Sequence, residues 1–253
     1  MLIDLRSRIV VVSGAGRGIG RALAERFRDE GATVVALDLA FPDTPSDGID
    51  SLVCDVTDEG SVTGAIDEVI RRHGRVDVLV NNAGIDVGGP VDTLDLARWR
   101  ACFEVNVTGV FLLAKAVIPH MKAARSGRII NASSFAAIIP SVGSAAYGAS
   151  KAAVVQLTRV LASELGPWNI TVNAYAPGMI PTAMNGFASM PEDKQERLLD
   201  TLSLRRWESP EDVADLLCFL ASDAAGYITG TLVDVSGGKF ATQMPQRAYE
   251  ELT

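Results

Sequence analysis

The stretch RIVVVSGAGRGIGRALAERF, residues 8–27, decides the fold. An apolar, β-branched run leads into a glycine-rich turn, and the turn leads into a segment whose apolar residues recur with the period of a helix. Backbone amides of such a turn, together with the helix N-terminus, can bind a pyrophosphate. The stretch therefore predicts a buried strand, a helix and a dinucleotide site between them.

The same alternation continues along the chain. Further apolar runs are ATVVALD, SLVCDV, VDVLVNN, GRIINAS, ITVNAYAPG and TGTLVDV, with segments of helical period between most of them. Continuous apolar strands followed by helices are typical of a parallel sheet covered on both faces. We therefore predict a doubly wound, Rossmann-like parallel sheet in a three-layer α/β/α arrangement. At 253 residues, all of the chain fits one domain.

Two segments depart from this alternation. Residues 178–209 are rich in methionine, proline and charge. A long insertion after a strand, inside a compact domain, is usually functional, so this segment is predicted to be a substrate lid. Residues 239–253 show no clear period. We expect them to form a C-terminal tail that reaches the lid of a neighbouring subunit.

Composition excludes several classes of partner. Lysine and arginine total 23 against 31 acidic residues, which gives a net charge of -8, so nucleic acid is not expected to bind. The start lacks an export signal, and no run offers about 18 uninterrupted apolar residues, so we expect no membrane span and a cytoplasmic location. Three scattered cysteines and two histidines form no metal-spaced pair, which predicts neither disulfides nor a metal site.

The glycine turn also bears on the type of cofactor. Gly14, Gly18 and Gly20 follow a GxxxGxG spacing, and the second predicted strand ends in Asp38. A carboxylate at that strand end can accept hydrogen bonds from a ribose 2′-hydroxyl and would repel a 2′-phosphate, which favours NAD. Arg17, within the turn, is the opposing signal because a guanidinium could bind that phosphate.

Several motifs now occur together in one order. They are SGAGRGIG, CDV at 54–56, NNAG at 81–84, NVTG at 106–109, the spacing of Ser134 to Tyr147, YGASK at 147–151 and PGMIPT at 177–182. Together they resemble the short-chain dehydrogenase/reductase family, in its compact single-domain branch. The resemblance extends from about residue 8 to residue 238.

The resemblance implies site residues by position. Ser134, Tyr147 and Lys151 would be catalytic, with Asn106 as a fourth member placed by a helix irregularity to hold a water. Asp55 and Val56 would contact the adenine. Thr182 and the Ile180 backbone would bind the carboxamide of the nicotinamide. The full cofactor set is Gly14, Arg17, Gly18, Ile19, Gly20, Asp38, Asp55, Val56, Asn82, Ala83, Gly84, Tyr147, Lys151, Pro177, Gly178, Ile180 and Thr182.

The catalytic set suits the transfer of a hydride and a proton. Tyr147 and Lys151 are four residues apart on one predicted helix and therefore share a face. A nearby ammonium and an oxidised nicotinamide both favour the phenolate, so Tyr147 is predicted to be the acid/base. Ser134, which has the family spacing to Tyr147 where Ser133 does not, would donate to the substrate oxygen.

The substrate is constrained only loosely. Candidate pocket residues are Asp86, Phe135, Met184 and Phe187, which combine apolar walls with one acid. Such a pocket is compatible with a small secondary alcohol, a polyol or a sugar. Asp86 can equally be read as an exposed loop residue.

Two other readings stay open. The first is an NADPH-dependent 3-oxoacyl-[acyl-carrier-protein] reductase, for which Arg128 could help to dock an acidic carrier, although Trp168 stands where a second arginine is common. The second is a cofactor-binding regulator without catalysis, which would be expected to lack the Tyr or the Lys. The resemblance also implies a homotetramer, built through the two helices that contain Asn106 and Lys151 and through the last strand.

Overall fold

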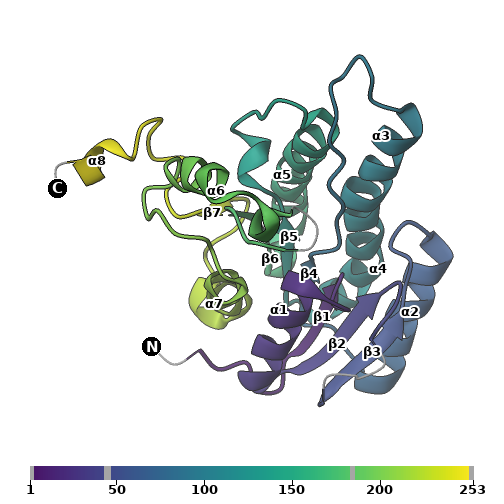
Figure 1. The fold of residues 1–253 in the computed structure, drawn as a ribbon. Helices are drawn as coiled ribbons and strands as arrows, with labels where there is room; N and C mark the ends of the chain where they lie inside the picture. The colour runs from purple at the N-terminus through teal and green to yellow at the C-terminus, as the bar shows by residue number, and fades with distance from the viewer. Residues whose placement is uncertain (1–2, 43–46, 183–185, 251–253) are drawn as a thin grey trace.

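The computed structural model describes residues 3–42, 47–182 and 186–250, and the seven strands in this part form one parallel sheet (Figure 1). The strand order is β3-β2-β1-β4-β5-β6-β7, so the chain winds outward from β1 in both directions and confirms the doubly wound prediction. The strands are β1 (Ile9–Ser13), β2 (Thr33–Asp38), β3 (Ile49–Val53), β4 (Val78–Asn81), β5 (Gly127–Ala132), β6 (Ile170–Pro177) and β7 (Leu232–Val235).

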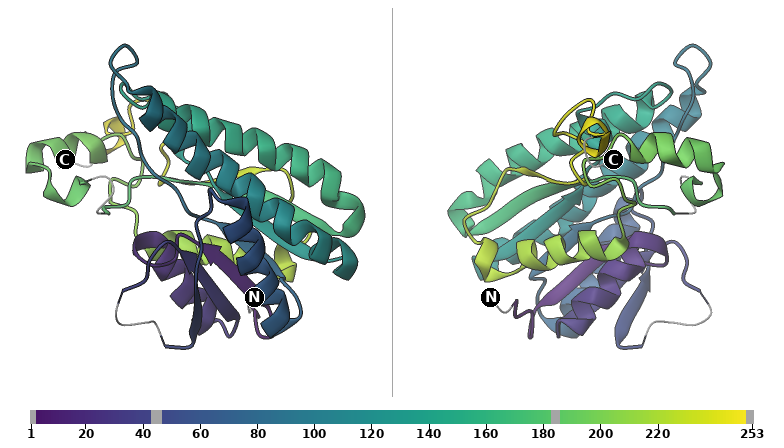
Figure 2. Two further views of the ribbon diagram at one scale, coloured as in Figure 1. Left: turned by 90° about the vertical axis from the view of Figure 1, so that its right-hand side faces the viewer. Right: turned by 60° about the vertical axis from the view of Figure 1, so that its left-hand side comes forward.

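Helices cover both faces of the sheet (Figure 2). One face packs against α1 (Gly18–Asp29) and α7 (Pro210–Ala221), and the other against α2 (Glu59–His73), α4 (Gly109–Ala124) and α5 (Ala145–Leu165). Because side chains alternate along a strand, Val10 and Val12 of β1 join the first core and Val11 joins the second. This explains why the strands are apolar throughout.

The remaining helices are shorter than most of those that cover the sheet. α3 (Leu96–Phe103) runs into a π-helix, η1 (Glu104–Thr108), and then into α4, while α6 (Glu192–Leu199) and α8 (Arg247–Glu250) lie near the C-terminal part of the chain. Short 3-10 turns are η2 (Phe135–Ala137), η3 (Gly166–Trp168), η4 (Phe187–Ser189) and η5 (Asp223–Ala225). The predicted lid segment, 178–209, thus contains η4 and α6.

Local sequence explains where the longer helices begin and end. Asp58 caps α2 by accepting a hydrogen bond from the Ser61 amide, and Gly74 ends it with a φ of 77°. At α7, Ser209 and Asp212 form a capping box ahead of the apolar run.

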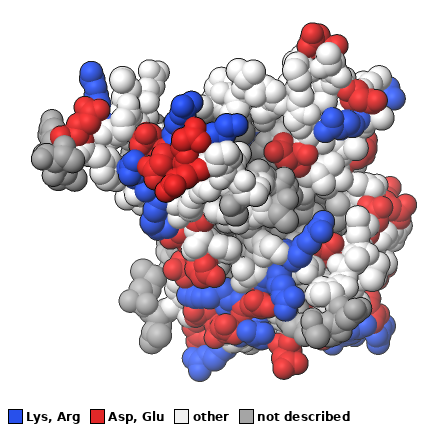
Figure 3. Space-filling model, viewed as in Figure 1, with Lys and Arg blue, Asp and Glu red and all other residues white. Residues whose placement is uncertain are grey.

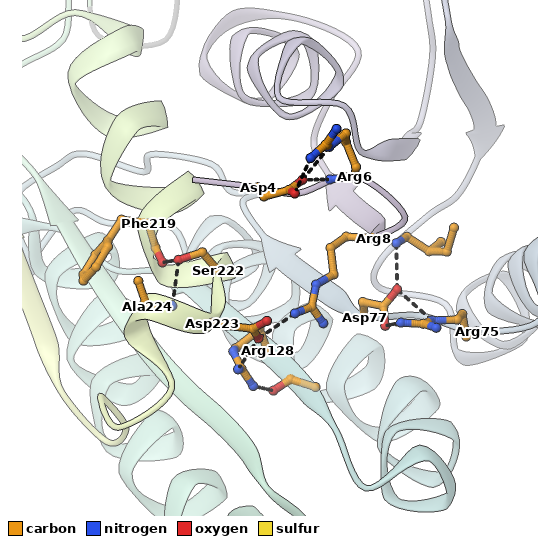
Figure 4. A network of polar contacts seen from close by, with 12 residues as sticks. Asp4, Arg6, Arg8, Arg75, Asp77, Arg128, Phe219, Ser222, Asp223 and Ala224 are labelled. Carbon is orange, nitrogen blue, oxygen red and sulfur yellow. Dashed lines mark hydrogen bonds and ion pairs between the residues drawn. The ribbon is translucent and has the colours of Figure 1, made fainter. Parts of the chain in front are cut away.

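The amino ends of the strands are held by ion pairs that each join one buried and one exposed side chain, or nearly so (Figure 4). Asp223 accepts from Arg8 at 2.6 Å and from Arg128 at 3.3 Å, and Asp77 accepts from the Ile9 amide and pairs with Arg75. Arg128 is only 5% exposed and stands at the start of β5, at the edge opposite the predicted active site. The suggestion that Arg128 docks a carrier protein is therefore wrong, because its guanidinium is committed to the interior.

Within the described residues, the run Leu96–Ala124 is long and apolar enough to cross a membrane by length and composition alone. Its most apolar window is 44% buried, and Leu113 and Val117 of α4 belong to the core beside α2 and α5. Core helices pass the same test, so the run is weak evidence for a span.

Candidate active site

The glycine turn after β1 is shaped by close packing. A Cβ atom on Gly20 would lie 2.0 Å from the Gly14 carbonyl oxygen, and one on Gly14, whose φ is 66°, would lie 2.7 Å from Ala83 Cα. Gly18 differs, because its φ of 58° requires glycine while its Cβ position faces open space. Arg17, the N-cap residue of α1, makes no side-chain cap hydrogen bond. The first-turn amides and the open side of Gly18 fit a pyrophosphate.

Ser13 and Asn82 attach this turn to the end of β4. The Ser13 hydroxyl accepts hydrogen bonds from the amides of Asn82 and Ala83, each at 3.1 Å, while Asn82 Nδ2 donates to the carbonyls of Ser13 and Gly14. The buried Tyr175 hydroxyl in turn donates to Asn82 Oδ1 at 3.2 Å. Sequence reasoning missed Tyr175, because an aromatic residue within an apolar strand gives no sign of a polar role.

Asp38 lies beside the turn and is held by backbone amides. Its carboxylate accepts from Gly16 at 2.8 Å and from Leu39 at 2.7 Å. Gly16 was not among the predicted residues, yet a Cβ there would lie 2.4 Å from the Ala40 carbonyl oxygen. The second glycine in SGAGRGIG, which the GxxxGxG spacing leaves out, was the available signal.

The predicted adenine residues lie at the end of β3, in the segment before α2. Asp55 Oδ1 accepts hydrogen bonds from the amide and the hydroxyl of Thr57, at 2.9 and 2.7 Å. Val56 is buried and packs closely on Gly109, where a Cβ would lie 2.9 Å from the valine side chain. Both residues are thus fixed by short-range contacts.

Asn106 lies within the π-helix, which is the helix irregularity that the resemblance implied. Its side chain accepts from the Ile85 amide at 2.8 Å and donates to the Ile85 carbonyl and the Ser150 hydroxyl, both at 3.0 Å. The amide group thus ties the loop after β4 to α5. Ser150, one residue before Lys151, is a part of this network that sequence reasoning did not identify.

The structure brings Ser134, Tyr147 and Lys151 together. The Ser134 hydroxyl interacts with the Tyr147 hydroxyl and opposes the rise in its pKa, and Lys151 Nζ lies 5.6 Å from the centre of the Tyr147 ring. Lys151 Nζ also donates to the Ala132 carbonyl at 2.9 Å, and the Ser133 hydroxyl donates to the Lys151 carbonyl at 3.1 Å. Ser133 thus supports the α5 backbone, whereas Ser134 interacts with Tyr147, and the assignment of Ser134 as the catalytic serine stays a prediction.

Burial controls the protonation of this pair. It raises the pKa of Tyr147 to about 12, with the Ser134 hydrogen bond opposing the rise, and it lowers the pKa of Lys151 to about 8. In the chain by itself, desolvation disfavours both charged forms, and the prediction that the ammonium and an oxidised nicotinamide together favour the phenolate stays a prediction. Positive charge brought next to Tyr147 would offset this cost.

The predicted substrate residues lie at the same edge of the sheet, as far as the structure describes them. Asp86 follows β4 and is exposed, although partial burial of its carboxyl raises the pKa. Phe135 directly follows Ser134, and Phe187 stacks on Trp207 with ring centres 5.5 Å apart. Met184 lies outside the described residues.

The end of β6 leads into the lid segment through Gly178. A Cβ on Gly178 would lie 2.9 Å from Ser236 Cα, and its amide donates to the carboxyl of Glu208. Glu208 is 7% exposed, its Oε1 has no hydrogen-bond partner among the described residues, and burial raises its pKa to about 8. Sequence reasoning missed Glu208, which reads as one more charge in a polar segment.

The remaining predicted cofactor residues lie at the sites described above or in the segment after β6. Ile19 is in the first turn of α1, Gly84 has its Cβ position 3.4 Å from Lys151 Nζ, and Pro177 ends β6. Ile180 is buried, and the Thr182 carbonyl accepts from the Gly186 amide. No cluster of metal-binding side chains occurs among the residues described.

Comparisons with known proteins agree with this geometry. A family model described as enoyl-(acyl carrier protein) reductase matches residues 14–239. A 3-oxoacyl-[acyl-carrier-protein] reductase of Thermotoga maritima is 38% identical, over 92% of this chain and 98% of the reductase. The meso-2,3-butanediol dehydrogenase of Serratia marcescens is 36% identical, over 93% of this chain and 96% of the dehydrogenase. Among solved structures, a gluconate 5-dehydrogenase from Burkholderia cenocepacia in complex with NADP and tartrate superposes with a TM-score of 0.89. Its sequence is 32% identical, and the match covers 95% of this chain and 98% of that protein.

Proposed function

The chain belongs to the short-chain dehydrogenase/reductase family, and we propose that it is an NAD-dependent oxidoreductase in which Tyr147 exchanges the proton of a secondary alcohol. Members of this family bind a nicotinamide cofactor and act on CH-OH groups. The observation that carries the proposal is the contact of Ser134 with Tyr147 above the buried ammonium of Lys151, at the same sheet edge as the glycine turn.

The roles follow from where each group is held. When bound, the nicotinamide supplies the hydride acceptor or donor. The substrate hydroxyl loses its proton to Tyr147 Oη as the C-H bond breaks, and Ser134 donates a hydrogen bond to the substrate oxygen as its charge changes. Tyr147 therefore enters this step as the phenolate, and the Lys151 ammonium stabilises that charge until the proton arrives. Asn106 keeps the loop after β4 in place beside them.

The cofactor would be bound along the carboxyl ends of β1, β2 and β4. The first turn of α1 would bind the pyrophosphate, and Asp38 would accept from the adenosine ribose. Because both Asp38 oxygens are already fixed by amides, the carboxylate cannot turn away from a 2′-phosphate without losing those bonds. This favours NAD over NADP.

The substrate we propose is a small secondary alcohol, a polyol or a sugar. The named activities of the butanediol and gluconate dehydrogenases support this class. Segment 178–209 would cover the substrate, with Phe187 as one of the pocket walls.

A 3-oxoacyl-carrier reductase is the second candidate, because the relative from Thermotoga maritima bears that name. A carrier protein is acidic and needs a basic docking face. Arg128 is buried, and the face in Figure 3 shows acidic and basic side chains interspersed without a large basic area. Arg205 and Arg206, for example, pair with Glu196 and Asp212. We therefore rank this activity below alcohol oxidation, and a regulator without catalysis below both, since all four catalytic positions are filled.

We also propose a cytoplasmic homotetramer. The α3–α4 run and α5 lie side by side (Figure 2), and Phe111 and Val160 on these helices are 48% and 43% exposed. Exposed apolar side chains on adjacent helices are suited to a subunit interface. The described part of the tail contacts its own chain, where the Tyr249 hydroxyl donates to the Ser203 carbonyl, so a neighbouring lid is not needed to hold it.

The experiment that tests the function is a substrate panel. Secondary alcohols, polyols and aldoses are offered with NAD⁺ and separately with NADP⁺, and the reverse reaction uses 3-oxoacyl thioesters. Formation or loss of reduced nicotinamide is followed by absorbance. We expect alcohol oxidation with NAD⁺, whereas exclusive activity on oxoacyl thioesters with NADPH would favour the second candidate.

A further inference from the structure

Lys239 is a cation that the proposed reaction does not use. It follows Ser236, Gly237 and Gly238 at the end of β7, and the two glycines have φ values of 67° and 86°. The chain turns sharply here and returns against the lid segment, where a Cβ on Gly238 would lie 2.5 Å from the Ser203 side chain. The turn therefore places Lys239 at the carboxyl edge of the sheet, where the site lies.

The Lys239 side chain reaches between the lid segment and η2, the turn that follows Ser134. Its Nζ donates to the Thr201 hydroxyl and lies 5.5 Å from the centre of the Phe135 ring. Thr201 uses its own proton on the Leu198 carbonyl, so it acts toward Lys239 as an acceptor. Phe135 is the residue next to Ser134. The ammonium thus lies against the 3-10 turn that directly follows the catalytic serine.

No described carboxylate pairs with this ammonium. Burial alone lowers the pKa of Lys239, with no acidic group contributing. The arginines of the lid segment differ, since Arg205 pairs with Glu196 and Asp200, and Arg206 with Asp212. An ammonium has three donors, and here one hydroxyl accepts. Partial burial without a counter-ion is costly unless an anion arrives.

We propose that Lys239 binds the carboxylate of the substrate, so that the alcohol oxidised at Tyr147 is a hydroxy acid. This inference rests on the proposed function and narrows its substrate class. A single ammonium beside a single hydroxyl matches one carboxylate, whereas phosphate is bound more often by an arginine fork or several amides. The aromatic face of Phe135 would hold the ammonium while the anion approaches from the pocket.

The test uses matched pairs of alcohols. Each pair consists of a hydroxy acid and its neutral twin, for example 4-hydroxycyclohexanecarboxylate with cyclohexanol, 3-hydroxybutanoate with 2-butanol, and gluconate with the corresponding alditol. We measure kcat/KM for each member and, independently of turnover, its dissociation constant by calorimetry with the Tyr147→Phe variant saturated with NAD⁺. We expect the acid to exceed its twin by about 10–100-fold in at least one pair.

Variants assign that preference to the ammonium. In Lys239→Met the ratio of acid to twin should fall by about 10–100-fold, and Lys239→Arg should restore most of it. Lys194→Met, which removes an exposed lysine from α6, controls for a general loss of positive charge. Thr201→Val removes the contact with the lid segment but keeps the ammonium. If Lys239 served only to tie the lid, Thr201→Val would change the ratio as Lys239→Met does, and the proposal would be overturned.

The other outcomes are also decisive. Equal affinity for acid and twin in every pair, or no binding by any of them, overturns the inference, as does tighter Lys239-dependent binding of a phosphate monoester of the same alcohol. Oxidation of the neutral twins that is sensitive to Tyr147→Phe would meanwhile uphold the proposed function. Loss of all alcohol oxidation, with carboxylate binding still dependent on Lys239, would refute the function and keep the subsite.

Discussion

The site has two sides that are built differently. On the strand-end side, polar groups of Ser13, Asn82 and Asn106 are bonded to backbone amides and carbonyls of neighbouring elements. On the lid side, single side chains meet across loops, as Lys239 meets Thr201 and Phe187 meets Trp207. The first arrangement fixes the position of reacting groups, and the second leaves the pocket shape to a few contacts. Substitutions should therefore abolish function on the first side and alter preference or stability on the second.

The largest effect is expected at Lys151. Lys151→Met should lower kcat/KM by about 10²–10⁴-fold near neutral pH, because it removes the charge beside Tyr147 and the bond to Ala132. Since the pKa of Lys151 is about 8, the wild-type ammonium is present below that pH and lost above it. The deficit of the variant should thus shrink as the pH rises from about 7 to about 10. A pH-rate profile measures this, and a constant deficit would refute the electrostatic role.

The second-largest effect is expected from a substitution in the glycine turn. Gly20→Ala places a Cβ 2.0 Å from the Gly14 carbonyl and 2.5 Å from Asn82 Nδ2. We expect a loss of about 2–4 kcal/mol in the free energy of unfolding, together with loss of dinucleotide binding. The matched control is Gly64→Ala in α2, where nothing lies within 4 Å and stability should rise by about 0.5–1 kcal/mol. Denaturant unfolding and calorimetry check both variants, and equal effects would show that packing does not define the turn.

A smaller effect is expected at Asp38, which is proposed to select NAD over NADP. Asp38→Asn keeps an oxygen for the Gly16 amide but removes the charge, so the preference for NAD over NADP should fall by about 10–100-fold. Asp47→Asn, at an exposed position after the end of β2, should leave the preference unchanged. Kinetics with both cofactors measure the ratio. If Asp38→Asn has the same ratio as wild type, Asp38 does not select the cofactor.

The smallest effect is expected on the lid side, at Glu208. Burial raises its pKa from an ordinary 4.5 to about 8, so the folded chain binds the proton more tightly than the unfolded chain. Stability should therefore fall as the pH rises from about 4.5 to about 8, with the full penalty present above that range. Glu208→Gln keeps an acceptor for Gly178 and removes the charge, and should gain about 1 kcal/mol above pH 8, or roughly 2–4 °C in Tm. Thermal unfolding at acidic and alkaline pH should show a gain only at the latter, and an equal gain at both would refute titration of this carboxyl.

The sequence predicted the strand-end side well because its signals are local. Apolar runs, glycine spacing and the four-residue offset of Tyr147 and Lys151 determine the sheet, the turn and the shared helix face. It missed Tyr175, Glu208 and Lys239, whose contacts join residues distant in the chain, such as Tyr175 to Asn82. The rise in the pKa of Tyr147 also has no signal in the sequence, because desolvation depends on packing from several elements.

The central claim is that Tyr147 transfers the proton. The most direct measurement compares Tyr147→Phe with wild type for both turnover and the dissociation constant of NAD⁺, using Tyr227→Phe, which alters a fully exposed tyrosine, as the control. We predict that Tyr147→Phe loses at least about 10³-fold in kcat while NAD⁺ binding stays within about threefold, and that Tyr227→Phe matches wild type. Turnover by Tyr147→Phe within about tenfold of wild type would contradict the account.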